Sequence, residues 1–123
     1  MPSDETHFNS IYRRIIANSL FTDRQTYIIY KSLLNRNSVR NISRGAYYRQ
    51  VKQCRRKIIR VLYSSLLLQS LGAFDPMTLS VLQTLSERLG VISLEASSDI
   101  TDTKAIDNLM QALDHTLKKM CNM

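Results

Sequence analysis

The stretch ISRGAYYRQVKQCRRKIIRVLYSSLLLQSL, residues 42–71, predicts one long helix. Ser43 is a good N-cap, and Ile42 before it faces Tyr47 in the arrangement of a hydrophobic staple. Gly72 can end the helix, which at 1.5 Å per residue is roughly 40 Å long. Its apolar or small residues recur at alternating spacings of four and three, namely Tyr47, Val51, Cys54, Ile58, Val61, Ser65 and Leu68. This seam predicts core packing, and we expect the second half, apolar nearly all round, to be core as well.

Basic residues are concentrated in the same region of the chain. Between Arg24 and Arg60 there are eleven Lys and Arg residues and no Asp or Glu, while the segments on either side are slightly acidic and the whole chain carries +7. Such a concentration of like charge is unfavourable unless an anion relieves it. Eight of the eleven are arginines, whose planar fork suits phosphate oxygens and guanine edges. The segment therefore predicts a polyanionic partner.

Length and composition predict one helical domain. A chain of 123 residues has the size of a single domain, and with three Gly and two Pro it has few of the tight turns that an all-β fold requires. We expect an all-α bundle of about five helices, with a helix-turn-helix-like element and one long central helix. Within the domain 1–123, residues 22–71 form the basic part, and residues 75–123 form an acidic helical scaffold or dimerisation part.

Apolar periodicity and capping signals predict the other helices. The first runs from about residue 6 to 19, and the second begins at Thr22, which forms a capping box with Gln25. The fourth begins at Asp75 and Pro76 and ends at Gly90. We expect the second helix to bury Ile28, Ile29, Tyr30 and Leu33, and the fourth to bury Leu79, Leu82, Leu85 and Leu89.

Residues 91–102 read as a connector with a short extended piece, and Thr101 or Asp102 caps the last helix. The last helix has a heptad-like stripe of Ile106, Leu109, Met110, Leu113, Leu117 and Met120. Such a stripe packs on its own domain more often than on a partner. A homodimer through this helix, or through the apolar end of the central helix, is the alternative.

Several classes of protein are disfavoured. Cys54 and Cys121 form no CxxC pair, and His7 and His115 stand alone, so we expect no metal site, no cofactor and no disulfide framework. The sequence shows no nucleophile elbow or phosphate-cradling glycine loop, and we expect no enzymatic activity. The most apolar stretch, residues 61–74, is too short to span a bilayer. We therefore expect a cytoplasmic, nucleoid-associated protein with no membrane partner.

The order FTDRQTYIIYKSL (residues 21–33), a polar link and ISRGAYYRQVKQCRRKIIR (residues 42–60) resembles the helix-turn-helix half of sigma-factor region four and LuxR-type regulators. More closely, together with YSSLLLQSLG (residues 63–72), it resembles small archaeal proteins described as helix-turn-helix regulators. The likeness covers residues 11–90. It implies that Ser43, Arg44, Tyr48, Arg49, Lys52 and Arg56 lie on a recognition-helix surface. In the sigma pattern a scaffold helix lies between the opening helix and the recognition helix. Here only residues 35–41 lie between them, so the opening helix must serve directly as the first helix of the motif.

We therefore expect a DNA-binding protein, a transcriptional regulator or chromatin-associated factor, that contacts double-stranded DNA through residues 44–60. The alternative is a non-enzymatic adaptor that docks an acidic protein or RNA through the same helix. The expected contact residues are Arg40, Ser43, Arg44, Tyr48, Arg49, Lys52, Arg55, Arg56 and Arg60.

Overall fold

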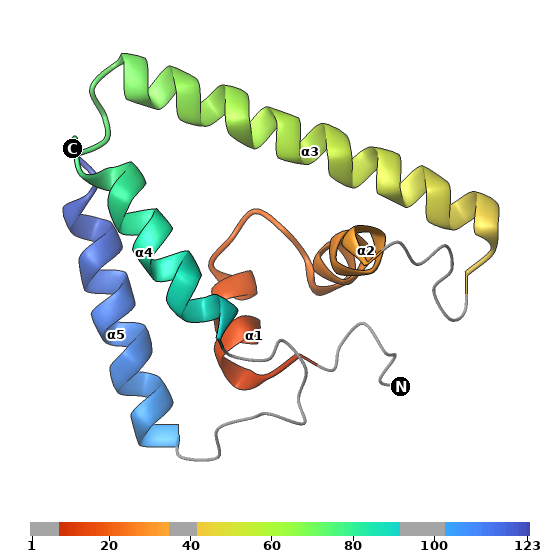
Figure 1. The fold of residues 1–123 in the computed structure, drawn as a ribbon, viewed down its shortest axis with the longest axis horizontal. Helices are drawn as coiled ribbons and strands as arrows, with labels where there is room; N and C mark the ends of the chain where they lie inside the picture. The colour runs from red at the N-terminus through yellow and green to blue at the C-terminus, as the bar shows by residue number, and fades with distance from the viewer. Residues whose placement is uncertain (1–7, 35–41, 92–102) are drawn as a thin grey trace.

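The structure, a computed structural model, describes residues 8–34, 42–91 and 103–123. Within these ranges it consists of helices joined by turns, so the all-α class with one long central helix is confirmed. The helices are α1 (Ser10–Ala17), α2 (Asp23–Leu33), α3 (Arg44–Ser70), α4 (Thr78–Gly90) and α5 (Thr103–Lys119). Figure 1 shows α3 along one edge of the molecule, with α4 and α5 side by side on another and α1 and α2 between them.

Side-chain caps set the bounds of α1 and α2. Asn9 adopts an extended conformation, and its Oδ1 accepts a hydrogen bond from the Tyr12 amide at 2.9 Å. The helix thus begins at Ser10, and the prediction that it reaches from about residue 6 to 19 was too long; residues 6 and 7 lie outside the described ranges. The capping box of Thr22 and Gln25 is confirmed, with both hydrogen bonds at 3.0 Å.

Both ends of α3 lie where the sequence predicts them. Ser43 Oγ accepts a hydrogen bond from the Ala46 amide at 3.1 Å. At the other end Gly72 has a φ of 76°, and the Ala73 amide donates to the Leu68 carbonyl at 2.9 Å. This is the hydrogen bond of a Schellman motif, in which the left-handed residue is usually glycine. The sharp stop turns the chain away from the axis of α3 before α4 begins.

The start of α4 differs from the prediction. Asp75 Oδ1 accepts from the Met77 amide at 2.8 Å, and the Asp75 carbonyl accepts from the Thr78 amide at 2.9 Å, so a closed turn precedes the helix. The backbone of this turn also bonds to the chain's last residues: the Asp75 amide donates to the Met120 carbonyl at 2.8 Å. Asp75 is therefore part of a turn held by residues after α5, and α4 begins at Thr78.

Two apolar clusters form the core, and α1 contributes to both. The first joins α1, α2 and the first half of α3 through Phe8, Ile16, Tyr27, Ile28, Tyr47 and Cys54. The second joins α1 and α5 through Ile11, Ile106 and Met110, with Leu89 of α4 packed against it. The Tyr12 hydroxyl donates to the Leu89 carbonyl at 3.2 Å, which ties α1 to the end of α4. Because it packs into both clusters, α1 links the basic helix to the carboxyl-terminal helices.

The second half of α3 belongs to neither cluster, and the prediction that it is core was wrong. Its side chains at Leu62, Tyr63, Leu66 and Leu67 are exposed. The reason is geometric: α2 covers only the first half of α3, and α4 runs away from the second half (Figure 1). The seam positions Ile58 and Leu68, predicted as core, are also exposed.

Three further positions expected in the core are exposed, whereas Tyr27 and Ile28 of α2 are buried. Leu33 lies at the open end of α2, and Leu79 and Leu82 lie on the outer face of α4. Tyr27, which we did not predict as core, is buried beside Ile28 because it meets Phe8 edge to face at 6.4 Å between ring centroids. In α2 and α4 the predicted helical spacing was right, but the buried side is rotated about the helix axis from the predicted one.

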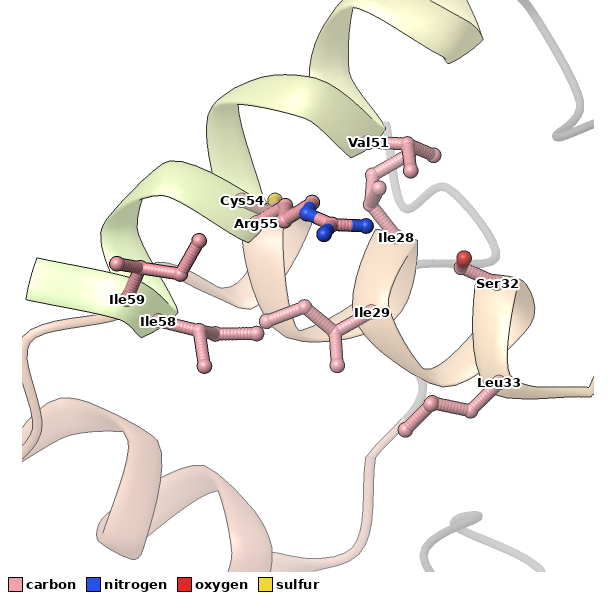
Figure 2. A pocket seen from close by; sticks show the side chains of 9 residues that line it. All are labelled: Ile28, Ile29, Ser32, Leu33, Val51, Cys54, Arg55, Ile58 and Ile59. Atoms are coloured by element: carbon pink, nitrogen blue, oxygen red, sulfur yellow. The ribbon is translucent and has the colours of Figure 1, made fainter. Parts of the chain in front are cut away.

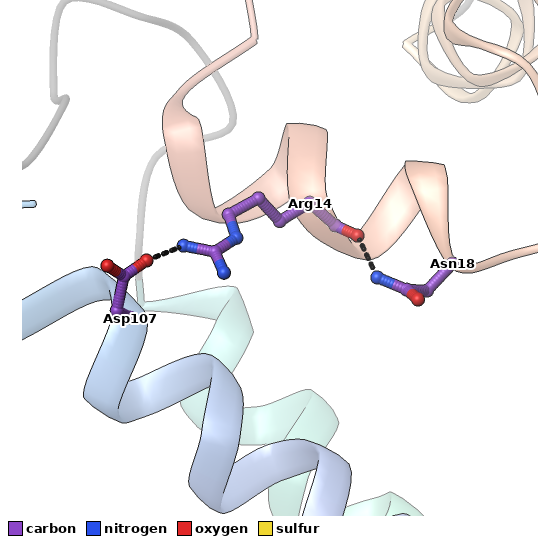
Figure 3. A network of polar contacts seen from close by, with 3 residues as sticks. All are labelled: Arg14, Asn18 and Asp107. Carbon is purple, nitrogen blue, oxygen red and sulfur yellow. Dashed lines mark hydrogen bonds and ion pairs between the residues drawn. The ribbon is translucent and has the colours of Figure 1, made fainter.

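The last helix packs on its own chain through half of its stripe. Ile106 and Met110 are buried and Leu113 packs against them, whereas Leu109 and Leu117 are exposed. Figure 3 shows the polar contact beside this packing: Arg14 of α1 forms an ion pair with Asp107 of α5, and the Arg14 carbonyl accepts from the Asn18 side chain at 2.8 Å. The connector 92–102, including the expected caps Thr101 and Asp102, lies outside the described residues.

Candidate nucleic-acid interface

The first half of α3 has one buried side and one exposed side. Tyr47 and Cys54 are 2% and 3% exposed and pack against α1 and α2. Six cationic side chains lie on the outward surface of the same helix. These residues, together called the basic face, are Arg44, Arg49, Lys52, Arg55, Arg56 and Arg60, and all six are exposed. Because the buried side is rigidly packed, the helix holds the basic face in a defined orientation.

The charges of the basic face are not neutralised by the acidic residues of the described chain. Asp107 pairs with Arg14 and Asp114 pairs with Lys118, whose pKa is raised by its hydrogen bond with Asp114. None of the six basic-face side chains forms an ion pair with a residue in 8–34, 42–91 or 103–123. The field of these six charges therefore extends into solvent.

Three other cations of the basic segment make hydrogen-bond or ring contacts within the fold. Lys57 lies over the Phe21 ring at 5.1 Å, and its Nζ donates to Gln25 Oε1 at 3.0 Å. Lys31 lies over the Tyr27 ring at 5.1 Å. Arg24 Nε donates to Gln50 Oε1 at 3.2 Å, which links α2 to α3. These contacts hold the three side chains in place. Sequence composition alone did not distinguish these three residues from the basic face.

The amino-terminal turn of α3 is open to a ligand. Ser43 Oγ is occupied as an acceptor by the Ala46 amide, but its hydroxyl hydrogen can still be donated to a phosphate oxygen. A Cβ added at Gly45 would meet nothing within 4 Å, so no described residue obstructs an approaching backbone there. The free amides of a helix amino terminus favour an anion at this place.

Tyr48 is the aromatic side chain of this surface. It is 49% exposed, and its ring lies 5.7 Å from the Tyr47 ring with a tilt of 60°. Burial raises the pKa of the Tyr47 hydroxyl, and the neighbouring Tyr48 raises it further, whereas a hydrogen bond with Ser32 lowers it. The buried ring thus supports an exposed one that can contact a sugar or a base.

The structure brings together eight of the nine predicted contact residues. Ser43, Arg44, Tyr48, Arg49, Lys52, Arg55, Arg56 and Arg60 all lie on α3 or at its cap. Arg40, the ninth, lies outside the described residues, as does the link 35–41 that departs from the sigma-factor pattern. The hydrogen bond between Arg24 and Gln50 was not predicted from the sequence, because it depends on how α2 crosses α3.

Other chemistry has little support in the described part of the chain. The described residues contain no group of three or more His, Cys, Asp or Glu side chains that could hold a metal ion. Cys54 is buried on the seam, and burial raises the pKa of its thiol, although nearby Lys57 lowers it in part. A thiol in such surroundings is a poor nucleophile.

No helix among the described residues has both the length and the apolar character needed to cross a membrane. The fold and the site thus define an all-α protein with a rigid, basic helical surface. No protein-family model, curated protein or solved structure matches this chain.

Proposed function

We propose that the chain is a non-enzymatic DNA-binding protein that contacts double-stranded DNA through the basic face. The observation that carries the proposal is the exposure of six cations on one side of one helix, with no acidic partner among the described residues. Contacts from Arg and Lys to phosphates supply most of the affinity of such a surface, because binding releases the counterions condensed on DNA.

The dimensions of α3 favour duplex DNA. The major groove of B-form DNA is about 12 Å wide and admits an α-helix, whereas the major groove of A-form RNA is too deep and narrow for side chains to read. In this proposal Arg44, Tyr48 and Arg49, which lie in the first turns of α3, contact base edges. Lys52 to Arg60, along the next roughly 12 Å of helix, contact phosphates.

The proposed role is that of a transcriptional regulator or chromatin-associated factor of the nucleoid, as the resemblance to archaeal helix-turn-helix regulators implies. The two roles make different predictions for genome-wide mapping of the bound protein. Discrete peaks support a regulator and even coverage supports a chromatin protein, whereas the absence of any signal would refute DNA binding in the cell.

The direct test reverses two charges of the basic face. Arg49→Glu with Lys52→Glu should abolish retardation of a duplex DNA fragment and leave the helical circular dichroism unchanged, because both side chains are exposed. Arg13→Glu with Lys119→Glu is the matched control, since it changes the charge equally on exposed positions of α1 and α5. Equal loss in both variants, or unchanged binding in the first, would contradict the assigned surface.

Competition identifies the polyanion. Duplex DNA should displace a labelled duplex more effectively than structured RNA or polyglutamate at the same charge concentration, because only B-form DNA offers a groove for the helix. Equal competition by all three polymers would support the adaptor alternative instead.

A further inference from the structure

An apolar surface begins where the basic face ends. Between Val61 and Phe74 the chain has no charged residue. Along the outer side of α3 the apolar side chains recur as on one side of a helix and continue onto the end of α2. These residues, called the apolar face, are Leu33, Ile58, Ile59, Leu62, Tyr63 and Leu66, and their exposed fractions range from 38% to 78%.

A groove between α2 and α3 joins the two parts of the apolar face. It has a volume of about 370 Å³ and is lined by Ile28, Ile29, Leu33, Ile58 and Ile59 among others. Figure 2 shows Ile29 of α2 and Ile58 of α3 pointing toward one another, with Leu33 further along α2 and the Arg55 side chain extending from α3 toward α2. Ile59 lines this groove and is 40% exposed, and Leu62 and Leu66 follow it about one and two turns further along α3.

The size of the apolar face is that of a protein interface. With on the order of 120 Å² exposed on each of its six residues, it presents roughly 700 Å² of apolar surface. The largest apolar patch on a typical monomer is roughly 300–600 Å², and a stable dimer buries about 800 Å² on each partner. The apolar face is therefore close to the size that a second copy of this chain would bury.

We propose that two copies of this chain associate through their apolar faces, with the two α3 helices antiparallel. In this arrangement Ile59 of each copy lies opposite Leu66 of the other, and Leu62 and Tyr63 of both copies surround the two-fold axis. The contact is self-complementary, as a two-fold interface requires. The end of α3 beyond Leu66 then lies over the groove of the other copy.

Charge decides the direction of the helices. A parallel pair would place the basic residues Arg55 to Arg60 of both copies side by side, where like charges repel. An antiparallel pair brings Arg56 to the level of Gln69 and Arg60 to the level of Ser65 of the other copy along the helix axis, so no two cations share a level. The first turns of the two α3 helices, from Arg44 to Lys52, then lie at opposite ends of the pair.

The distance between the two basic faces follows from the helix rise. This step rests on the proposed function, under which that distance is compared with the spacing of half-sites on DNA. In this register Lys52 of the two copies is separated by roughly 30 Å along the helix axis, and Arg49 by roughly 40 Å. Successive half-sites on one side of DNA lie roughly 34–36 Å apart. At 100° per residue, Arg49 and Arg56 point about 90° away from the contact line, so these residues of both copies point to the same side of the dimer.

The first experiment measures the mass of the full chain in solution by light scattering. The wild type should be a dimer, and Leu66→Glu should be a monomer with unchanged helical circular dichroism, because Leu66 is exposed in the single chain. Leu20→Glu is the matched control with similar exposure on a loop that faces the other side of α3, and it should remain a dimer. A monomeric wild type, a dimeric Leu66→Glu, or loss of the dimer by Leu117→Glu in α5 would overturn the proposal.

The second experiment measures the direction of the helices. A spin label is attached to Gln53→Cys, with exposed Cys121 replaced by serine and buried Cys54 left in place. Double electron–electron resonance then measures the distance between the labels of the two copies. The antiparallel pair predicts roughly 30 Å, and a parallel pair predicts roughly 10 Å, which would overturn the register.

These results are separable from the proposed function. A Leu66→Glu monomer should bind a single half-site weakly but with an unchanged requirement for Arg49 and Lys52. A protein that dimerises as described but ignores DNA would refute the function and leave the interface standing, whereas a wild-type monomer that binds DNA tightly would do the reverse.

Discussion

The strength of the basic face can be measured by removing two of its charges without reversing them. In the variant Arg49→Gln with Lys52→Gln, two exposed side chains keep a polar end and lose their charge. Neither forms an ion pair with a described residue, so folding should be unaffected. Any change in DNA binding then reports the loss of contacts with phosphate.

The magnitude follows from the number of exposed cations. Each phosphate contact contributes about 0.9 to the slope of the logarithm of affinity against the logarithm of salt concentration. Six contacts give a limiting slope of about −5.4 for the wild type, and the variant should fall to about −3.6. At 0.15 M salt the same relation predicts about 30-fold weaker binding, or roughly 2 kcal/mol.

The assay is fluorescence anisotropy of a labelled duplex over a series of salt concentrations. The control is Arg13→Gln with Lys119→Gln, which removes the same charge from α1 and α5. If the control loses as much slope as the variant, binding depends on net charge alone. An unchanged slope in the variant would refute the reasoning that these two residues contact phosphates.

Three further predictions concern the fold. Gly72→Ala should lower the free energy of unfolding by about 1–2 kcal/mol in urea titrations, because the residue has a φ of 76° with open space around it; no loss would mean that the left-handed turn is unimportant. In the native protein a thiol reagent should modify Cys121 rapidly and Cys54 only after unfolding, because Cys54 is buried and burial raises the pKa of its thiol; two fast thiols would contradict this packing. Burial also raises the pKa of Tyr12 and Tyr47 above the ordinary value near 10.0, so above that pH the unfolded chain binds fewer protons and stability should fall as pH rises; equal urea midpoints at about pH 9 and pH 11 would contradict the burial.

The start of α2 and both ends of α3 were predictable because their signals are local. The hydrogen bonds of Thr22 with Gln25 and of Ser43 with Ala46 join residues three apart, so they form wherever the helix forms. Gly72 likewise ends α3 through its own conformation. Asp75 shows the limit of such signals, because its turn is held by the Met120 carbonyl from the other end of the chain.

The covered side of each helix was less predictable, because it depends on distant packing. The exposure of the basic face was predicted correctly, since Tyr47 and Cys54 identify the buried side in the half of α3 that α2 covers. In the second half, Leu62 and Leu66 are apolar whether their own chain or another copy covers them. Sequence periodicity finds an apolar surface, but it does not identify its partner.

The most direct test of the central claim is a nuclear magnetic resonance titration of the isotope-labelled full chain with a short DNA duplex at low salt. The account predicts that amide and arginine side-chain signals from Ser43 to Arg60 shift with added duplex, while signals of α5 stay in place. Shifts centred on α5, or no shift at any duplex concentration, would contradict the claim that the basic face of α3 binds DNA.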